Sequence, residues 1–187
     1  QHQAGTDRQF ASIDRYIINA SDVDNIWWFN AYPGAMEDFH LLIEKSMANK
    51  YYGYAGVSKV MMAASLGVMT DLFGDIPYSE AFDPIKHKTP KFDSQKDIYA
   101  TIQTLLTEAK DNLSDTKSVL DPGADDLIYG GDLSLWTKAA NSLSARYWLH
   151  LEKQDANALT NCLKAIDAGA IGSNDEDMEL KFGTTET

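Results

Sequence analysis

Apolar residues recur at intervals of three and four along most of this chain, the pattern of amphipathic α-helices. The pattern predicts five helices over approximately residues 24–49, 52–73, 94–113, 133–152 and 155–168. Nowhere do β-branched and polar residues alternate at the two-residue period typical of a strand. We therefore expect an all-α protein, with residues 1–187 forming a single domain built from helix pairs.

The first two predicted helices form an antiparallel hairpin, because Asn49 and Lys50 leave room for only a short turn between them. Pro33 interrupts the first helix, which either kinks or begins there, since proline removes a hydrogen bond and clashes with the preceding turn. One face of this helix carries Trp28, Tyr32, Ala35, Phe39, Leu42 and Ser46. The expected buried stripe of the second helix is Val57, Val60, Met61, Ala64, Val68 and Leu72.

Two long loops separate the helices, at residues 74–93 and 114–131. In the first loop a glycine and three prolines break any helix: Gly74, Pro77, Pro84 and Pro90. Ser94 and Asp97 form a variant of the capping box that begins the third helix. Asp132 is the expected N-cap of the fourth helix, and Gly169 is the glycine expected just after the fifth.

The net charge of −12 argues against nucleic acid as a partner, because phosphates require clustered Lys and Arg. The basic residues are scattered, so none of them forms a run that holds the chain on an anionic membrane. Cys162 is the single cysteine and, with Leu159, Leu163 and Ile166 around it, is expected on a buried helix face. No signal peptide is visible in the sequence, and its polar ends suggest a piece of a longer protein, so this absence says nothing about targeting.

Catalytic signatures are missing from the sequence. The four histidines form no HExxH motif and no close pair with a carboxylate, and His40 is expected in the core or at its rim. Glu37 and Asp38 are adjacent carboxylates, but neighbours in sequence on a helix do not face each other across a substrate as a glycosidase pair must. Two acidic loop clusters lack the alternating ligand register of an EF-hand, which favours ordinary solvated loops over calcium sites: Asp121, Asp125 and Asp126, and Asp175, Glu176 and Asp177. We expect no enzyme, no metal and no cofactor.

Aromatic residues are concentrated near the start of the first predicted helix, at Trp27, Trp28, Phe29 and Tyr32. Four aromatic side chains within six residues cover more than one helical stripe, so some of them must point outward or into a neighbouring layer. Exposed aromatic planes stack on the CH faces of sugar rings, whereas buried ones pack the core. Trp27 is the candidate for a ligand-stacking residue in this group.

Four stretches of the chain resemble the signatures of one protein family. They are TDLFGDIPYSEAF at residues 70–82, PKFDSQKDIY at 90–99, DLIYGGD at 126–132 followed by WTKAANSL at 136–143, and GSND at 172–175. The first resembles the family pattern GDxPYxEA, and all four occur in the family's order and spacing. The chain thus resembles the SusD-like (SusD/RagB) family of nutrient-binding lipoproteins of the outer membrane.

The resemblance implies stacked antiparallel helix pairs, similar to a tetratricopeptide-repeat superhelix, on which long irregular loops build the ligand face. Family members capture oligosaccharides, or peptides in some relatives, at the surface of Bacteroidetes-type bacteria, without catalysis. They deliver the ligand to a SusC-like, TonB-dependent outer-membrane transporter and are held in the membrane by a lipid anchor. The resemblance also implies that this chain is an internal fragment, lacking the N-terminal anchor and the C-terminal half.

Two sets of residues follow from the resemblance. The architectural set, expected to hold loops against helices, is Gly74, Asp75, Pro77, Tyr78, Trp136, Asn141 and Arg146. The ligand-binding candidates, Trp27 included, are Gln3, Arg8, Phe10, Tyr16 and Trp27. Residues 1–23 hold no closely spaced tryptophan pair, a departure from the starch-binding relatives.

The alternative to nutrient capture is a helical-repeat adaptor that binds another protein and no nutrient; an all-α glycosidase is a more distant third.

Overall fold

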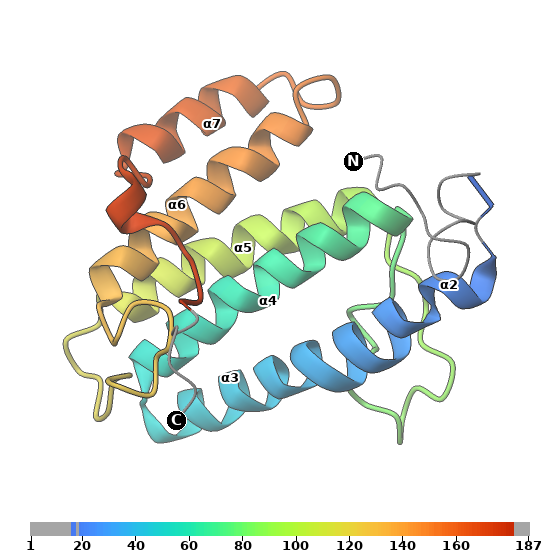
Figure 1. The fold of residues 1–187 in the computed structure, drawn as a ribbon, viewed down its shortest axis with the longest axis horizontal. Coiled ribbons are helices and arrows are strands. Elements are labelled where there is room, and N and C mark those ends of the chain that lie inside the picture. The colour runs from blue at the N-terminus through green and yellow to red at the C-terminus, as the bar shows by residue number, and fades with distance from the viewer. Residues whose placement is uncertain (1–15, 18, 182–187) are drawn as a thin grey trace, which may run out of the picture.

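The computed structural model describes residues 16–17 and 19–181, and within them the chain is helical (Figure 1). The helices are α2 (Ala20–Asn25), η1 (Ile26–Met36), α3 (Glu37–Asn49), α4 (Tyr52–Phe73), α5 (Gln95–Leu113), α6 (Leu133–His150), α7 (Ala158–Asp167) and the short 3-10 turn η2 (Asn174–Glu176). In this part of the chain the β pairing is limited to one antiparallel bridge, between Ile76 and Asp93. The predicted all-α class is confirmed.

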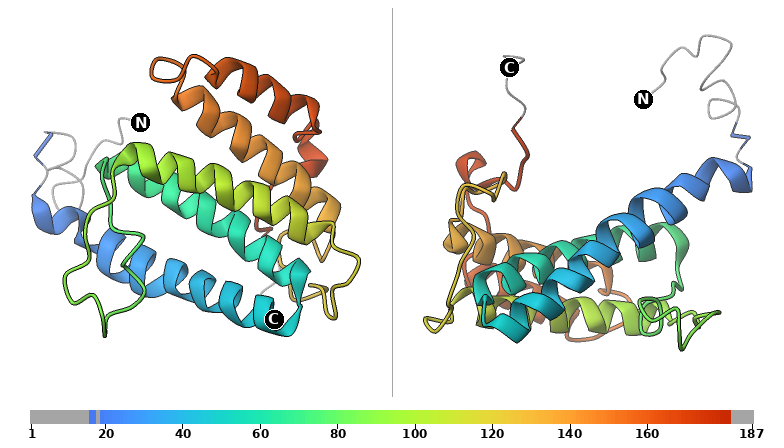
Figure 2. Two further views of the ribbon diagram at one scale, coloured as in Figure 1. Left: turned by 180° about the vertical axis from the view of Figure 1, so that it is seen from behind. Right: turned by 90° about the horizontal axis from the view of Figure 1, so that it is seen from below.

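Each helix packs against the next one along the chain: α3 on α4, α4 on α5, α5 on α6 and α6 on α7. Figure 2 shows these helices as neighbouring antiparallel rods, with the α6–α7 pair beside the α3–α4–α5 layer. The predicted hairpin of the first two helices is present, with its turn closed by Lys50 in the left-handed conformation at φ 60°. The arrangement is a stack of helix pairs similar to tetratricopeptide repeats.

The first helix is one run of three pieces, α2, η1 and α3, and begins at Ala20 instead of residue 24. The prolyl ring of Pro33 lies inside η1, where the backbone follows the wider π-helical pattern. Gly34 then leaves helical geometry at φ −94° and ψ −106°, and α3 starts three residues later, at Glu37. The predicted kink is confirmed, because the missing N–H and the ring of proline disrupt the regular ladder.

Helix α4 is the central element, and it has the predicted bounds but not the predicted buried stripe. Val68 and Leu72 of that stripe are 55% and 60% exposed, whereas Met62 and Leu66 outside it are fully buried. The helix contacts α3, α5, α6 and η1, so most of its circumference is enclosed, and a single stripe does not describe it. Its length and composition would suit a membrane span, but a buried core helix of a globular protein meets the same criteria.

Close contact between α4 and α6 depends on Gly67. A Cβ atom added there would lie 2.0 Å from the hydroxyl oxygen of Tyr147, whose side chain is buried. The core continues through α5, which packs against both α4 and α6, with Ile98, Ile102 and Leu106 each at most 1% exposed. The core thus lies around α4, and small residues set the distance between the layers.

The predicted helix ends are largely confirmed. The Ser94 side chain accepts a hydrogen bond from the Asp97 N–H at 3.2 Å, and Asp132 caps α6 through the N–H groups of Ser134 and Leu135. Helix α6 ends at His150 instead of residue 152. Helix α7 begins at Ala158 instead of residue 155.

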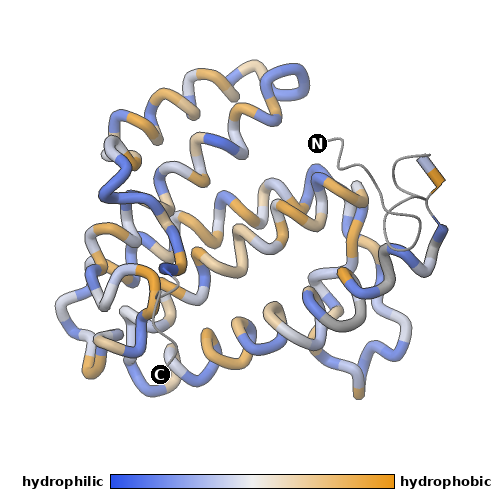
Figure 3. The backbone as a smooth tube through the Cα atoms, viewed as in Figure 1, coloured by the Kyte–Doolittle hydropathy of each residue, from blue (hydrophilic) through white to orange (hydrophobic). Residues whose placement is uncertain are grey.

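The predicted buried face around Cys162 is wrong for its larger residues. Cys162 itself is 8% exposed, but Leu159, Leu163 and Ile166 are about half exposed, at 54%, 60% and 48%. Figure 3 shows apolar positions on α7 as well as on the central helices. The larger side chains therefore follow the outer side of α7, and its buried residues are the small ones, Ala158, Cys162 and Ala165, of which Cys162 and Ala165 pack against Ala145 of α6.

Candidate functional site

The loop at residues 74–93 is held in a fixed path by its own polar groups. Gly74 ends α4 at φ 76°, a backbone conformation that other residues rarely adopt. Asp93 accepts hydrogen bonds from the N–H groups of Tyr78 and Ser79 and from the Ser79 hydroxyl, at 2.7–3.0 Å. Asp75 accepts one from the N–H of Gln95 at 2.8 Å. The loop is consequently fastened at both ends to helices α4 and α5.

The carboxylate of Asp93 is the main polar anchor of this loop. Burial alone would raise the pKa of Asp93, but the hydrogen bonds from Ser79 and Tyr78, with the nearby charge of Lys91, hold it below its usual range. A third tie runs to the first helix, where the Tyr32 hydroxyl donates to the carbonyl oxygen of Pro77 at 2.6 Å. Figure 2 shows the loop lying beside η1 and the start of α3. Two hollows form where the loop meets this helix.

The first hollow is the aromatic cleft, of about 380 Å³, and its walls are mostly apolar. Its lining residues are Trp27, Tyr32, Pro77, Ala81, Thr89, Pro90 and Phe92. The rings of Trp27 and Tyr32 stack with centroids 5.3 Å apart and planes 9° apart, and Phe73 supports the Trp27 ring from behind at 4.7 Å. Phe92 completes the wall at 6.5 Å from Trp27 and is 63% exposed. Flat rings with an open face are suited to stacking on another flat, weakly polar surface.

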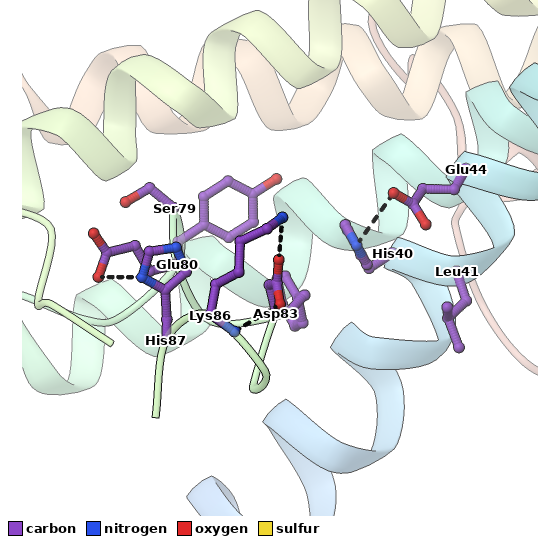
Figure 4. Close-up of a pocket in the computed structure, with 10 residues that line it drawn as sticks. His40, Leu41, Glu44, Ser79, Glu80, Asp83, Lys86 and His87 are labelled. Carbon is purple, nitrogen blue, oxygen red and sulfur yellow. Dashed lines mark hydrogen bonds and ion pairs between the residues drawn. The ribbon is translucent and has the colours of Figure 1, made fainter. Parts of the chain in front are cut away.

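The second hollow is the polar cavity, of about 560 Å³ (Figure 4). Its lining residues are His40, Leu41, Glu44, Tyr78, Ser79, Glu80, Phe82, Asp83, Lys86 and His87. Helix α3 supplies one wall, and the loop supplies the other. The loop residues alternate between the two hollows, since Pro77 and Ala81 line the aromatic cleft while Tyr78 and Phe82 line the polar cavity.

Histidines of the polar cavity are paired with carboxylates, contrary to the expectation from the sequence. His40 Nε2 lies 3.7 Å from Glu44 Oε1, and His87 Nδ1 lies 3.4 Å from Glu80 Oε2. The His40 ring also stacks on Phe82, with centroids 4.8 Å apart. The first pair was visible in the sequence, because residues four apart on a helix are neighbours. The second depends on the path of the loop.

Asp83 and Lys86 form the third charged pair of the cavity, with Nζ and Oδ2 2.7 Å apart (Figure 4). The hydrogen bond from the Lys86 side chain is the main reason that the pKa of Asp83 lies below its usual value, and the same contact raises the pKa of Lys86. The cavity therefore presents carboxylate acceptors, imidazole groups and an ammonium donor within one space. Such a mixed set of donors and acceptors matches a ligand rich in hydroxyl groups.

Of the ligand-binding candidates predicted from the sequence, one lines a hollow, one does not, and three are not described by the structure. Gln3, Arg8 and Phe10 lie outside the described residues. Tyr16 is 89% exposed, and it does not line either hollow. Trp27 lines the aromatic cleft. Phe92 was not among the candidates, although its position between a proline and the cap of α5 marks it as a loop aromatic.

The architectural candidates hold parts of the chain together in specific ways. Trp136 is 1% exposed and donates from Nε1 to Asp126 Oδ2 at 2.7 Å, so it anchors the loop that precedes α6. Asn141 holds a different segment, because its Nδ2 donates to the carbonyl oxygens of Ala168 and Gly169, after α7. Arg146 is exposed on α6. Tyr78 packs against the core, as expected of a loop that folds back onto the hairpin.

The acidic loop residues are used within the protein and are not simply solvated. Asp121 accepts from the N–H of Gly53 at 3.1 Å, and Asp125 accepts from the Tyr54 hydroxyl at 2.6 Å. Glu176 pairs with Lys138 and accepts from the N–H of Gly172. Within residues 19–181 no three His, Cys, Asp or Glu side chains are grouped as a metal site requires.

Helix pairs that carry an aromatic cleft and a polar cavity on one loop define a binding scaffold. The chain belongs to a family of such proteins: over residues 1–187 it matches the SusD-like family described as starch-binding and associating with the outer membrane. The family description names binding and not catalysis, in agreement with the expectation of a non-enzyme. No curated protein sequence matches the chain.

Solved structures of related proteins have the same fold. A chitin-binding protein is 28% identical with a TM-score of 0.75, over 86% of this chain and 34% of its own. A SusD-like protein named Bacteroidetes AC2a is 26% identical with a TM-score of 0.77, over 90% and 31%. A SusD/RagB family protein from Bacteroides thetaiotaomicron VPI-5482 is 28% identical with a TM-score of 0.68, over 80% and 32%. The chain spans about a third of the length of these relatives.

Proposed function

We propose that the protein captures oligosaccharides at the bacterial outer membrane, without chemical change, through the two hollows on either side of the 74–93 loop. The aromatic wall of Trp27, Tyr32 and Phe92 is the observation that carries this proposal. A sugar ring presents a flat face of CH groups, and such a face stacks on an aromatic plane that is held in place by its neighbours. The polar cavity would bind the hydroxyl groups of the same or an adjacent sugar unit.

Family membership supports this choice of ligand. The family is described as starch-binding, and one solved relative is a chitin-binding protein, so both known ligand names are glycans. Both are neutral polymers of pyranose rings. A peptide ligand is the second candidate within the same class of function, since the apolar cleft beside charged groups would also receive an extended chain carrying an aromatic side chain.

The proposed mechanism is capture followed by delivery. The partner we propose is a SusC-like, TonB-dependent transporter of the outer membrane, with the full-length protein lipid-anchored and facing outward. The description of the family as associating with the outer membrane supports this location. The role of the helical frame is to hold the loop rigid, so that little conformational entropy is lost when the ligand binds.

The test is calorimetric titration of the full-length protein with maltohexaose and chitohexaose. Phe92→Ala removes a ring that is 63% exposed, so it should weaken binding by about tenfold, the worth of one stacking contact of about 1–1.5 kcal/mol, while stability changes little. Ile85→Ala is the matched control, because Ile85 is 90% exposed on the same loop and lines neither hollow.

Three results would count against the proposal. Equal loss of affinity in both variants would show that the aromatic cleft is not part of the binding site. Release of shorter sugars from either oligosaccharide would indicate a glycosidase. Tight binding of a purified protein partner with no binding of glycan or peptide would favour the helical-repeat adaptor.

A further inference from the structure

The polar cavity carries more negative than positive charge. Three carboxylates line it, on Glu44, Glu80 and Asp83, against the single ammonium group of Lys86. That ammonium is already taken by Asp83 at 2.7 Å, so it offers little compensation to the other two carboxylates. Among the described residues Glu44 and Glu80 form no ion pair with a lysine or an arginine, and their partners are the imidazole rings of His40 and His87, at 3.7 and 3.4 Å.

Lys91, which also contacts Glu80, does not correct this imbalance. Lys91 donates its backbone N–H to Glu80 at 3.0 Å, but its ammonium group lies 3.6 Å from Asp93, which is itself a carboxylate. Figure 4 shows the two carboxylates at opposite ends of the cavity, Glu44 on α3 and Glu80 on the loop, with the Asp83–Lys86 pair between them. The Glu80 side chain is 28% exposed, so solvent screens its charge less than that of Glu44, which is 65% exposed.

We infer that this cavity makes the protein selective for uncharged oligosaccharides and excludes anionic ones such as uronates and sulfated sugars. The inference rests on the proposed function, since it describes which glycans the same site accepts. A neutral hydroxyl group donates to the free carboxylate oxygens, whereas a ligand carboxylate in the same place meets only like charge and loses its hydration. Repulsion of the wrong ligand is a common source of specificity.

The aromatic cleft alone does not discriminate between these ligands. Stacking depends on the CH face of the pyranose ring, and this face is the same in a hexose and in the uronate derived from it. Selection by charge therefore depends on Glu44 and Glu80. The two residues are the specificity-determining residues of the site.

The test compares the binding oligosaccharide with the same oligosaccharide oxidised at its primary hydroxyls to carboxylates, both titrated into the full-length protein at low salt. Because like charges repel in this partly enclosed cavity, the oxidised oligosaccharide should bind about tenfold more weakly than the neutral parent. In the double variant Glu44→Gln with Glu80→Gln, the ratio of the two dissociation constants should fall to about two or less. Glutamine keeps an acceptor oxygen at each position, so loss of charge is the main change.

Glu152→Gln is the matched control. Glu152 is exposed in the turn after α6 and lines neither hollow, so this variant should retain the wild-type ratio. Raising the salt concentration from roughly 0.02 M to roughly 0.5 M should reduce the ratio in the wild type, because surface charges are then screened over about 4 Å.

The outcomes separate the inference from the proposal on which it rests. Equal binding of the neutral and oxidised oligosaccharides would overturn the charge selectivity and leave glycan capture intact. A tenfold ratio that persists in the double variant would overturn the assignment to Glu44 and Glu80. Failure of every oligosaccharide to bind would overturn both.

Discussion

The carboxylate of Asp126 is expected to hold the loop before α6 in place, and replacing it with asparagine tests that role. Oδ1 accepts from the N–H groups of Ile128 and Tyr129 at 3.0 and 3.2 Å. Oδ2 accepts from the N–H of Gly131 at 3.1 Å and from Trp136 Nε1 at 2.7 Å. All four partners are donors, and only a carboxylate can accept from all of them at once.

Asp126→Asn has the same shape but turns one acceptor atom into a donor. Whichever way the amide is oriented, two N–H groups lose their partner and face another N–H. In one orientation the half-buried N–H groups of Ile128 and Tyr129 lose their acceptor, and in the other the N–H of Gly131 and the Nε1 of Trp136, which is 1% exposed, lose theirs. Each unpaired donor costs about 1–3 kcal/mol, with the half-buried ones toward the lower end. We expect the variant to be about 3 kcal/mol less stable, a fall in melting temperature of about 6–12 °C for a chain of this size.

Urea or thermal unfolding, followed by circular dichroism, measures this effect. Asp125→Asn is the matched control, because Asp125 is exposed and water can replace its contacts with Gly123 and Tyr54, so it should cost less than about 1 kcal/mol. If Asp126→Asn unfolds within about 0.5 kcal/mol of the wild type, the reasoning from buried donors is refuted.

Further predictions concern packing and pH. Gly67→Ala should destabilise the protein by about 1–3 kcal/mol in the same unfolding assay. The new Cβ would lie 2.0 Å from the hydroxyl of the buried Tyr147, so the α4–α6 contact must open. A variant as stable as the wild type would show that Tyr147 moves freely. Stability should also fall in acid. Burial alone would raise the pKa of Asp126 and of Asp93, but hydrogen bonds hold both below the pKa of an unfolded aspartate. The contribution of the two carboxylates to the free energy of unfolding is therefore complete above about pH 4, and it is lost as the pH falls through the lower pKa of the folded state. Unfolding measured from pH 7 to pH 2 should show a shallower acid loss in Asp126→Asn than in the wild type, and an equal loss would contradict the assignment.

The positions of the helices could be predicted from local sequence signals, whereas the faces that they bury could not. The bounds of α4 were predictable because Gly74 and Pro77 end it and the turn at Lys50 begins it. Its buried side was not, because α3, α5 and α6 enclose it from several directions, and contacts between helices far apart in sequence decide which residues are covered. The same reason explains α7, where periodicity alone identified an apolar stripe but not the side that faces α6.

The candidate site could be predicted only in part. Trp27 was identified because crowded aromatics cannot all face one core, and the His40–Glu44 pair lay within reach of helical spacing. The rest of the site depends on where the 74–93 loop runs. Phe92 reaches Trp27, and Glu80 reaches His87, only after Asp93 and Tyr32 have fixed the loop against the first helix. No spacing along the chain encodes such long-range contacts.

The most direct test of the account is a crystal structure of the full-length protein with a neutral oligosaccharide bound. We expect a pyranose ring stacked against Phe92 and Trp27 in the aromatic cleft, with hydroxyl groups directed toward Glu80 and Glu44 in the polar cavity. A sugar bound elsewhere on the protein, with both hollows empty, would contradict the central claim that the 74–93 loop forms the recognition surface.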